Sequence, residues 1–260
     1  YTGDLNRVVA TKEDAVYLIN AANNVFPDID LTIEDIESNW AGLRPLIHED
    51  GKEPSELSRK DEIFISDSGL ISIAGGKLTG YRKMAHRVID VVLETLPEKR
   101  KKKLKASTTD KIPLVNPVLN SAKEVESYQK EVENELLEIG LLKENAKYYA
   151  FYLTTTYGKN STLILDKYGF FSNGTPINKL MRAEVWYAIH YEMSNSLADF
   201  FVRRTGRLYF NIHSISEYLD IVVNDFKKYL DWDEHRVLKE KERMSLLLQD
   251  ATNYYAEEFK

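Results

Sequence analysis

The 260-residue chain contains no cysteine. Disulfide bonds, thiolate metal sites and cysteine nucleophiles are therefore excluded, and this composition suits a reducing cytoplasm. Long apolar runs are also absent, because no stretch approaches the roughly 18 consecutive apolar residues that a membrane-spanning helix needs. Charged residues make up 29% of the chain and the mean hydropathy is −0.41, so we expect a soluble protein.

Positive charge is in deficit, since the formal net charge is −6. No nucleic-acid partner is expected, because binding over a large surface would need the opposite balance. One local exception is the basic run from Lys99 to Lys105, which could attract phosphates or anionic lipids. No aromatic residue is interleaved with these cations, so we interpret the run as a solvated linker and place a domain boundary near Ala106.

One group of residues invites a metal-binding interpretation. His190 and Glu192, with Glu184 before them, are the one combination worth testing. Residues two apart point to different sides of a helix, and further ligands at workable spacing are lacking. We therefore assign no metal site.

The most informative stretch runs from Ile71 to Lys83. An apolar, β-prone run ends at Gly75 and Gly76, and an amphipathic helical pattern begins at Leu78. This order predicts a strand, a tight turn and a helix N-terminus, where unpaired N–H groups suit an anion or the electron-rich edge of a heterocycle. Lys77 adds a positive charge at the same place. A purely structural turn is the alternative, because short motifs also match by chance.

Other patterns outline the fold around this stretch. Thr11 and Asp14 form a capping-box pattern before a helix that ends at Pro27. Alternating residues at 62–66 and 70–74 predict an antiparallel hairpin, and the helix from Leu78 should bury one broad face. Beyond Ala106, periodicity predicts helices at residues 121–139, 144–157, 178–204, 215–230 and 233–259. The many aromatic residues there are interpreted as core rather than as a ligand box.

Three motifs in fixed order carry a family resemblance: Ser38-Asn-Trp-Ala-Gly-Leu-Arg-Pro-Leu46, Ser58-Arg-Lys-Asp61 and Gly75-Gly-Lys-Leu-Thr-Gly-Tyr-Arg-Lys83. They resemble the flavoprotein glycerol-3-phosphate dehydrogenases and, more closely, the bacterial α-glycerophosphate oxidases. The residues from Arg182 to Val185, Asp199 and Arg203 to Thr205 resemble the helical C-terminal domain of that family. The resemblance implies an α+β portion over residues 1–105, with antiparallel strands and a strand-turn-helix, followed by a mainly α-helical C-terminal domain over residues 106–260.

Members of this family begin with a strand, a Gly-x-Gly-x-x-Gly turn and a helix that hold the ADP part of FAD. This sequence carries no such pattern. We therefore expect the chain to be the C-terminal part of a longer protein, inactive alone, that works with an N-terminal FAD-binding region. FAD is expected in the complete protein and not in this part by itself.

The resemblance also implies a reaction and its residues. The family oxidises sn-glycerol 3-phosphate to dihydroxyacetone phosphate by hydride transfer to FAD, which oxygen reoxidises in oxidases and quinone in dehydrogenases. Oxygen is the expected acceptor here. The positions that match the substrate-side residues are Arg44, Arg59 and Lys77, and the positions that match the cofactor side are Gly75, Gly76, Lys77, Leu78 and Thr79. None of the five histidines is assigned as a general base, and no catalytic residue is assigned.

Two interpretations remain open at the level of sequence. The first is part of a glycerophosphate-oxidising flavoenzyme, for which we expect a cytoplasmic location and leave open attachment to the inner face of a membrane and homo-oligomer formation. The second is an autonomous helical interaction module without catalysis. The joint presence of Arg44, Arg59 and the Gly75–Thr79 turn favours the first, because an interaction module has no use for these motifs.

Overall fold

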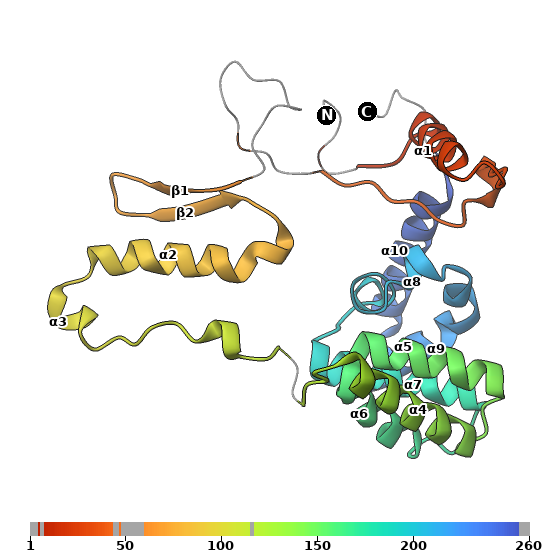
Figure 1. The fold of residues 1–260 in the computed structure, drawn as a ribbon. Helices are drawn as coiled ribbons and strands as arrows, with labels where there is room; N and C mark the ends of the chain where they lie inside the picture. Colours follow the sequence, from red (N-terminus) through yellow and green to blue (C-terminus); the bar gives the residue numbers. More distant parts are fainter. Residues whose placement is uncertain (1–4, 6–7, 44–46, 48–59, 115–116, 255–260) are drawn as a thin grey trace. The chain divides into compact units, whose positions relative to one another are not determined.

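The computed structural model describes residues 5, 8–43, 47, 60–114 and 117–254 (Figure 1). The chain forms two compact units, of which the smaller covers residues 43–114 and the larger combines residues 1–42 with 115–260. The boundary expected near Ala106 stays a prediction. The first 42 residues belong with the C-terminal helices, a grouping that the sequence did not suggest.

The smaller unit contains the predicted hairpin and helix. Strands β1 (Asp61–Ile65) and β2 (Ile71–Gly75) pair antiparallel, with Asp61 opposite Gly75 and Ile65 opposite Ile71. The hairpin turn is closed by the Gly69 N–H, which donates to the Ser66 carbonyl at 2.9 Å. After β2 come a 3₁₀ turn, η2 (Leu78–Gly80), and helix α2 (Tyr81–Thr95), which packs against β2. The unit ends with α3 (Glu98–Lys101) and η3 (Thr109–Lys111).

Helix α2 differs from the expectation in its burial. Its apolar face was expected to be buried, but no residue of α2 is buried and Ile89 is 54% exposed. The reason is geometric, because the two-stranded sheet is too small to cover a broad helix face. The basic run after α2 is likewise exposed and begins in α3, where Lys101 pairs with Glu98 at 3.1 Å.

The larger unit is built almost entirely of helices. Those before residue 161 are α1 (Lys12–Val25), η1 (Ile33–Asp35), α4 (Ala122–Glu138), α5 (Lys143–Tyr157) and η4 (Gly158–Asn160). Those after it are α6 (Ser161–Tyr168), α7 (Pro176–Glu192), the π-helix η5 (Asp199–Arg204), α8 (Arg207–Phe210), α9 (His213–Leu230) and α10 (Glu234–Thr252). The predicted capping box of α1 is confirmed, since Thr11 Oγ1 accepts from the Asp14 N–H at 3.2 Å.

Two apolar cores fill the helical unit, and α7 contributes to both. Helix α4 packs on α5, and α7 packs on α6 and on α9. From α7, Met181, Val185 and Ala188 enter the core that contains Phe200, Phe201 and Phe226. Leu180, Ala183 and Tyr187 enter the other core, with Leu136, Leu153 and Ile164. The aromatic residues are divided, because Phe200 and Phe201 are buried as expected whereas Tyr148, Phe151 and Phe210 are exposed.

The single helix predicted over residues 178–204 is wrong. Helix α7 ends at Glu192, and Met193 follows it in the left-handed region with φ 54°. The Ser194 N–H donates back to the Ala188 carbonyl at 2.9 Å, which closes the helix end, and the chain re-enters helical structure at Leu197, just before η5 begins at Asp199. The helix α6 was not predicted either, because its eight residues carry too short a pattern.

Candidate functional site

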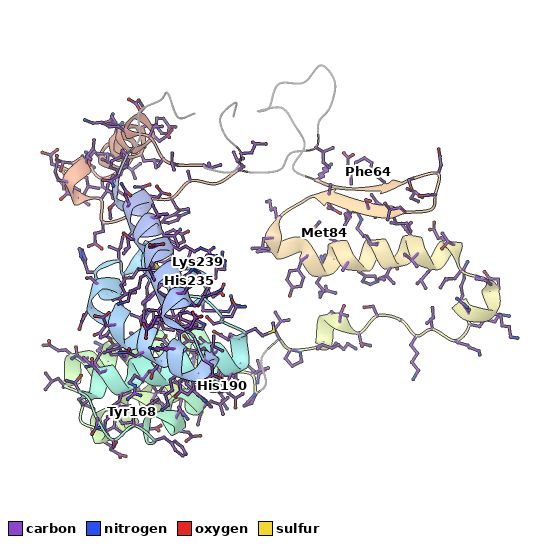
Figure 2. All side chains as sticks on the ribbon, turned by 180° about the vertical axis from the view of Figure 1, so that it is seen from behind. Phe64, Met84, Tyr168, His190, His235 and Lys239 are labelled. Carbon is purple, nitrogen blue, oxygen red and sulfur yellow. The ribbon has the colours of Figure 1, made fainter. Side chains whose placement is uncertain are left out.

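The turn between β2 and α2 requires glycine at two successive positions. Gly75 and Gly76 have φ values of +77° and +78°, which side chains other than hydrogen rarely permit. A Cβ on Gly75 would lie 2.6 Å from the Lys60 carbonyl oxygen. A Cβ on Gly76 would lie 2.8 Å from Sδ of Met84, a residue near the start of α2 (Figure 2). The turn is therefore packed tightly between β1 and α2.

After this turn, helical hydrogen bonds are donated only from residue 80 onward. The N–H groups before residue 80 therefore have no partner within the helix. The Gly80 N–H donates to the Lys77 carbonyl at 2.8 Å, and the Tyr81 N–H donates to the Leu78 carbonyl. The N–H groups of Leu78 and Thr79 precede these bonds, as the first donors of any helix do. Because Leu78 is 90% exposed, this corner is open to another molecule or chain segment.

The sequence-predicted residues are only partly placed. The structure gathers Gly75, Gly76, Lys77, Leu78 and Thr79 into the predicted turn, with Lys77 exposed in extended conformation just before η2. Arg44 and Arg59 lie outside the described residues, so their assignment to the substrate side together with Lys77 stays a prediction.

Polar contacts fix the strand that faces the turn. Asp61 stands opposite Gly75 in the sheet and forms an ion pair with Arg87 of α2. An apolar groove of about 570 Å³ follows α2 from Tyr81 to Ile89. Its other wall includes Ile112 and Leu114. The turn thus lies at the start of a helix that carries a groove along one side.

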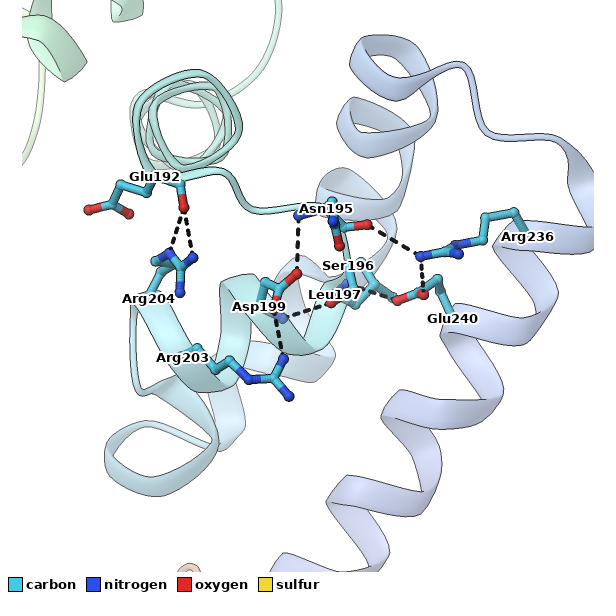
Figure 3. Close-up of polar contacts among 9 residues, drawn as sticks. All are labelled: Glu192, Asn195, Ser196, Leu197, Asp199, Arg203, Arg204, Arg236 and Glu240. Carbon is cyan, nitrogen blue, oxygen red and sulfur yellow. Dashed lines mark hydrogen bonds and ion pairs between the residues drawn. The ribbon is translucent and has the colours of Figure 1, made fainter. Parts of the chain in front are cut away.

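The cations near the end of η5 have structural partners (Figure 3). Arg203 pairs with Asp199 one turn earlier at 2.7 Å. Arg204 donates from Nε and Nη2 to the Glu192 carbonyl, the last of α7, at 2.9 and 2.7 Å. Glu240 of α10 accepts from the Leu197 N–H at 3.0 Å and pairs with Arg236. Arg203 and Arg204 therefore have structural roles, one within η5 and the other between η5 and the end of α7.

A buried ion pair in the helical unit was missed by sequence reasoning. Glu184 and Arg207, 3% and 5% exposed, pair at 2.8 Å. Tyr152 and Tyr157 donate to the same carboxylate, the latter at 2.7 Å. Burial, reinforced by the Glu184 charge, raises the pKa of both tyrosines well above the usual value, so both stay protonated. Burial alone would lower the pKa of Arg207, but the Glu184 carboxylate raises it overall.

The described part of the chain shows neither a metal site nor a membrane-spanning helix. Among the residues that the structure describes, no group of three or more histidine, aspartate or glutamate side chains is placed to hold a metal ion. Over the same residues, no helix has the length and apolar character to cross a membrane. His190 instead contacts its own helix, with Nδ1 2.8 Å from the Trp186 carbonyl oxygen.

Together these features define a two-part molecule: a strand-turn-helix with exposed N-terminal donors, and a helical domain. Residues 107–237, just over half of the chain, match the family described as the C-terminal domain of alpha-glycerophosphate oxidase. The chain belongs to this family.

Curated relatives extend the similarity to nearly the whole chain. The aerobic glycerol-3-phosphate dehydrogenase of Bacillus subtilis is 43% identical over 246 residues, which is 93% of this chain and 43% of that protein. The protein of the same name from Staphylococcus haemolyticus is 37% identical over 97% of this chain and 45% of its own length. The chain thus spans less than half the length of these relatives.

One solved structure has the same fold. The X-ray structure of the glycerol-3-phosphate dehydrogenase from Bacillus halodurans complexed with FAD aligns with a TM-score of 0.78 and 33% identity. The alignment covers 99% of this chain and 49% of that one. The expected fold class, an α+β portion followed by a mainly helical domain, is confirmed.

Proposed function

We propose that this chain forms one part of a flavoenzyme that oxidises sn-glycerol 3-phosphate to dihydroxyacetone phosphate. The observation that carries the proposal is the exposed glycine turn from Gly75 to Thr79 before α2, in a chain that matches glycerol-3-phosphate dehydrogenases over nearly all of its length. The remaining part of the enzyme corresponds to the region of the relatives that this chain does not match.

The turn fits one edge of FAD. When bound, FAD accepts the hydride that leaves the substrate carbon, and negative charge grows on the flavin ring. The N–H groups of Lys77, Leu78 and Thr79 precede α2 in the chain and would stabilise that charge together with the positive end of the helix dipole. A well-placed donor of this kind contributes on the order of 3 kcal/mol to the transition state. The absence of Cβ atoms at Gly75 and Gly76 keeps the turn in this form.

Substrate binding is assigned to three cations. A dianionic phosphate is bound best by guanidinium and ammonium groups, and we propose Arg44, Arg59 and Lys77 for this role. Arg59 precedes Asp61 by two positions in the sequence, and Asp61 stands opposite Gly75 in the sheet. Lys77 is exposed and free to reach a ligand that lies over the turn.

We propose oxygen as the electron acceptor, which yields hydrogen peroxide with each turnover. Quinone is the alternative, and hydrogen peroxide formation distinguishes the two. We further propose that the 260-residue chain is inactive alone and binds no FAD by itself, because it spans less than half the length of its relatives.

A chimera tests the proposal directly. The chain replaces the 246 residues that it matches in the Bacillus subtilis relative, and FAD content, glycerol 3-phosphate oxidation and hydrogen peroxide are measured. We expect an FAD-loaded protein that consumes glycerol 3-phosphate, whereas the 260-residue chain alone shows neither FAD binding nor turnover. A folded, FAD-loaded chimera without glycerol 3-phosphate oxidation would show the proposal to be wrong. Turnover without hydrogen peroxide would refute oxygen as the acceptor.

A further inference from the structure

The loop between α6 and α7 is held at both ends and exposed in the middle. At its start, Phe171 is buried and its N–H donates to the Tyr168 carbonyl at 3.1 Å. At its end, the Thr175 side chain caps α7 by accepting from the Asn178 N–H at 3.2 Å. Residues 172–174, between these two anchors, are exposed. The middle of the loop is therefore fixed in place but open to water.

The exposed part contains Asn173 followed by Gly174, and no other asparagine of the chain is followed by glycine. The backbone nitrogen after an asparagine can attack the carbonyl carbon of the asparagine side chain. Glycine hinders this attack least, because it has no side chain. Among the described residues, neither the Asn173 side chain nor the Gly174 N–H has a hydrogen-bond partner. The attacking nitrogen and the amide under attack are therefore both free.

Asn178, in the first turn of α7, provides the contrast. The N–H of the next residue, Lys179, donates to the Thr175 carbonyl at 3.0 Å. This hydrogen bond must open before the Lys179 nitrogen can attack the Asn178 side chain. Loss of one such bond corresponds to about a tenfold change in rate. The structure thus protects Asn178 and leaves Asn173 unprotected.

We propose that Asn173 is a site of spontaneous deamidation. The Gly174 nitrogen forms a bond to Cγ of Asn173, and the bond between Cγ and the side-chain nitrogen breaks. The Gly174 proton leaves with that nitrogen as ammonia, and a succinimide ring remains. Water then opens the ring at one of its two carbonyl groups, which gives aspartate or isoaspartate. Water is the only co-reactant, and no group is oxidised or reduced.

Both products change the entrance to α7. The first turn of this helix carries no acidic residue. Deamidation supplies a carboxylate just before it, where the positive end of the helix dipole favours negative charge. Isoaspartate also lengthens the main chain by one CH2 group between the anchored residues Phe171 and Thr175. The modification therefore acts at the start of the helix that contributes to both cores.

The test follows the folded 260-residue chain during incubation at mildly alkaline pH. Trypsin releases residues 168–179 as one peptide that contains both Asn173 and Asn178. Tandem mass spectrometry locates the exchange of ammonia for water, and labelling by protein isoaspartate methyltransferase detects isoaspartate. Each rate is compared with that of the same asparagine in the free peptide 168–179, which removes the intrinsic effect of the next residue.

The expected result is a different protection factor at the two asparagines. Asn173 should react in the folded chain no more than about threefold slower than in the free peptide, whereas Asn178 should be slowed by about tenfold or more. Slowing of Asn173 by more than about tenfold, or equal slowing at both positions, overturns the proposal.

Asn173→Gln is the matched control variant. It keeps an exposed amide but places it one bond farther from the backbone, where closure of a five-membered ring is impossible. The variant should lose the isoaspartate signal of this peptide and keep the Tm of the unmutated chain, because residue 173 is exposed. Isoaspartate that persists at the same level shows that it forms elsewhere and overturns the assignment. Gly174→Ala is unsuitable, because Gly174 has φ +110° and alanine would strain the loop.

Discussion

Replacing the glycines of the hairpin and turn one at a time with alanine should give a graded loss of stability. Gly69, Gly75 and Gly76 all have positive φ, at +82°, +77° and +78°. They differ in what a new Cβ would meet. At Gly69 nothing lies within 4 Å, at Gly76 the nearest atom is the flexible Met84 Sδ, and at Gly75 it is the backbone oxygen of Lys60.

The expected magnitudes follow from this order. A left-handed alanine costs about 1–2 kcal/mol at any of the three positions. Gly69→Ala should cost only that amount. Gly76→Ala should cost slightly more, because Met84 must rotate away. Gly75→Ala should cost about 1–3 kcal/mol beyond the backbone term, because a Cβ at 2.6 Å from the Lys60 oxygen forces β1 away from β2.

Amide hydrogen exchange read by mass spectrometry is the suitable assay, since it reports local opening of β1 and β2. A cost of 1–2 kcal/mol corresponds to roughly 5- to 30-fold faster exchange in the strands. Gly69→Ala should fall in that range, whereas Gly75→Ala should exceed it by another factor of about ten or leave the strands unprotected. Equal exchange rates in the Gly69→Ala and Gly75→Ala variants would show that the close approach of the Lys60 oxygen to Gly75 has no effect on stability.

Three further outcomes are expected. In the chimera, Lys77→Ala should lower kcat/KM for glycerol 3-phosphate by about 10- to 100-fold, because a charged hydrogen bond to the substrate is lost. The Tm should change little, because Lys77 is exposed. Unchanged kinetics would show that Lys77 is not part of the site. Arg207→Met should lower the free energy of unfolding measured in urea by about 3–5 kcal/mol, because it leaves the buried Glu184 unpaired. Arg203→Met removes an exposed ion pair and should lower it by less than about 1 kcal/mol. Similar losses of stability in the two variants would contradict this difference. Burial raises the pKa of Glu192 above its ordinary 4.5; Arg204 offsets this only in part, and Glu184 reinforces it. The protonated Glu192 side chain therefore stabilises the fold at lower pH, and this contribution to the free energy of unfolding is lost as pH rises through the raised pKa. The Tm advantage of Glu192→Gln should therefore grow from acidic to neutral pH, and a constant difference would contradict the assignment.

Local signals were sufficient for much of the fold. The Thr11–Asp14 capping box and Pro27 bracket α1, and the alternating residues around Gly69 define the hairpin. Gly75 and Gly76, at the end of β2 and just after it, marked the turn because their conformational requirement is intrinsic to the residue type. Each of these features depends on neighbours within a few positions, which sequence patterns report well.

Distant contacts were the part that the sequence could not reveal. The break after Glu192 carries neither glycine nor proline, and its left-handed residue is Met193. The pairing of Glu184 with Arg207 joins two helices, and the docking of Asn39 on Ala251 crosses most of the chain. Such contacts depend on packing between elements, which leaves no periodic trace in either segment.

Helix α7 has a consequence for how the helical domain comes apart. Its opposite faces lie in different cores, so neither core can lose α7 without exposing apolar side chains of the other. Melting should therefore be a single cooperative transition over both cores, with no stage in which one half of the bundle survives alone. A destabilising substitution on either face of α7 should therefore lower the melting temperature of the whole bundle.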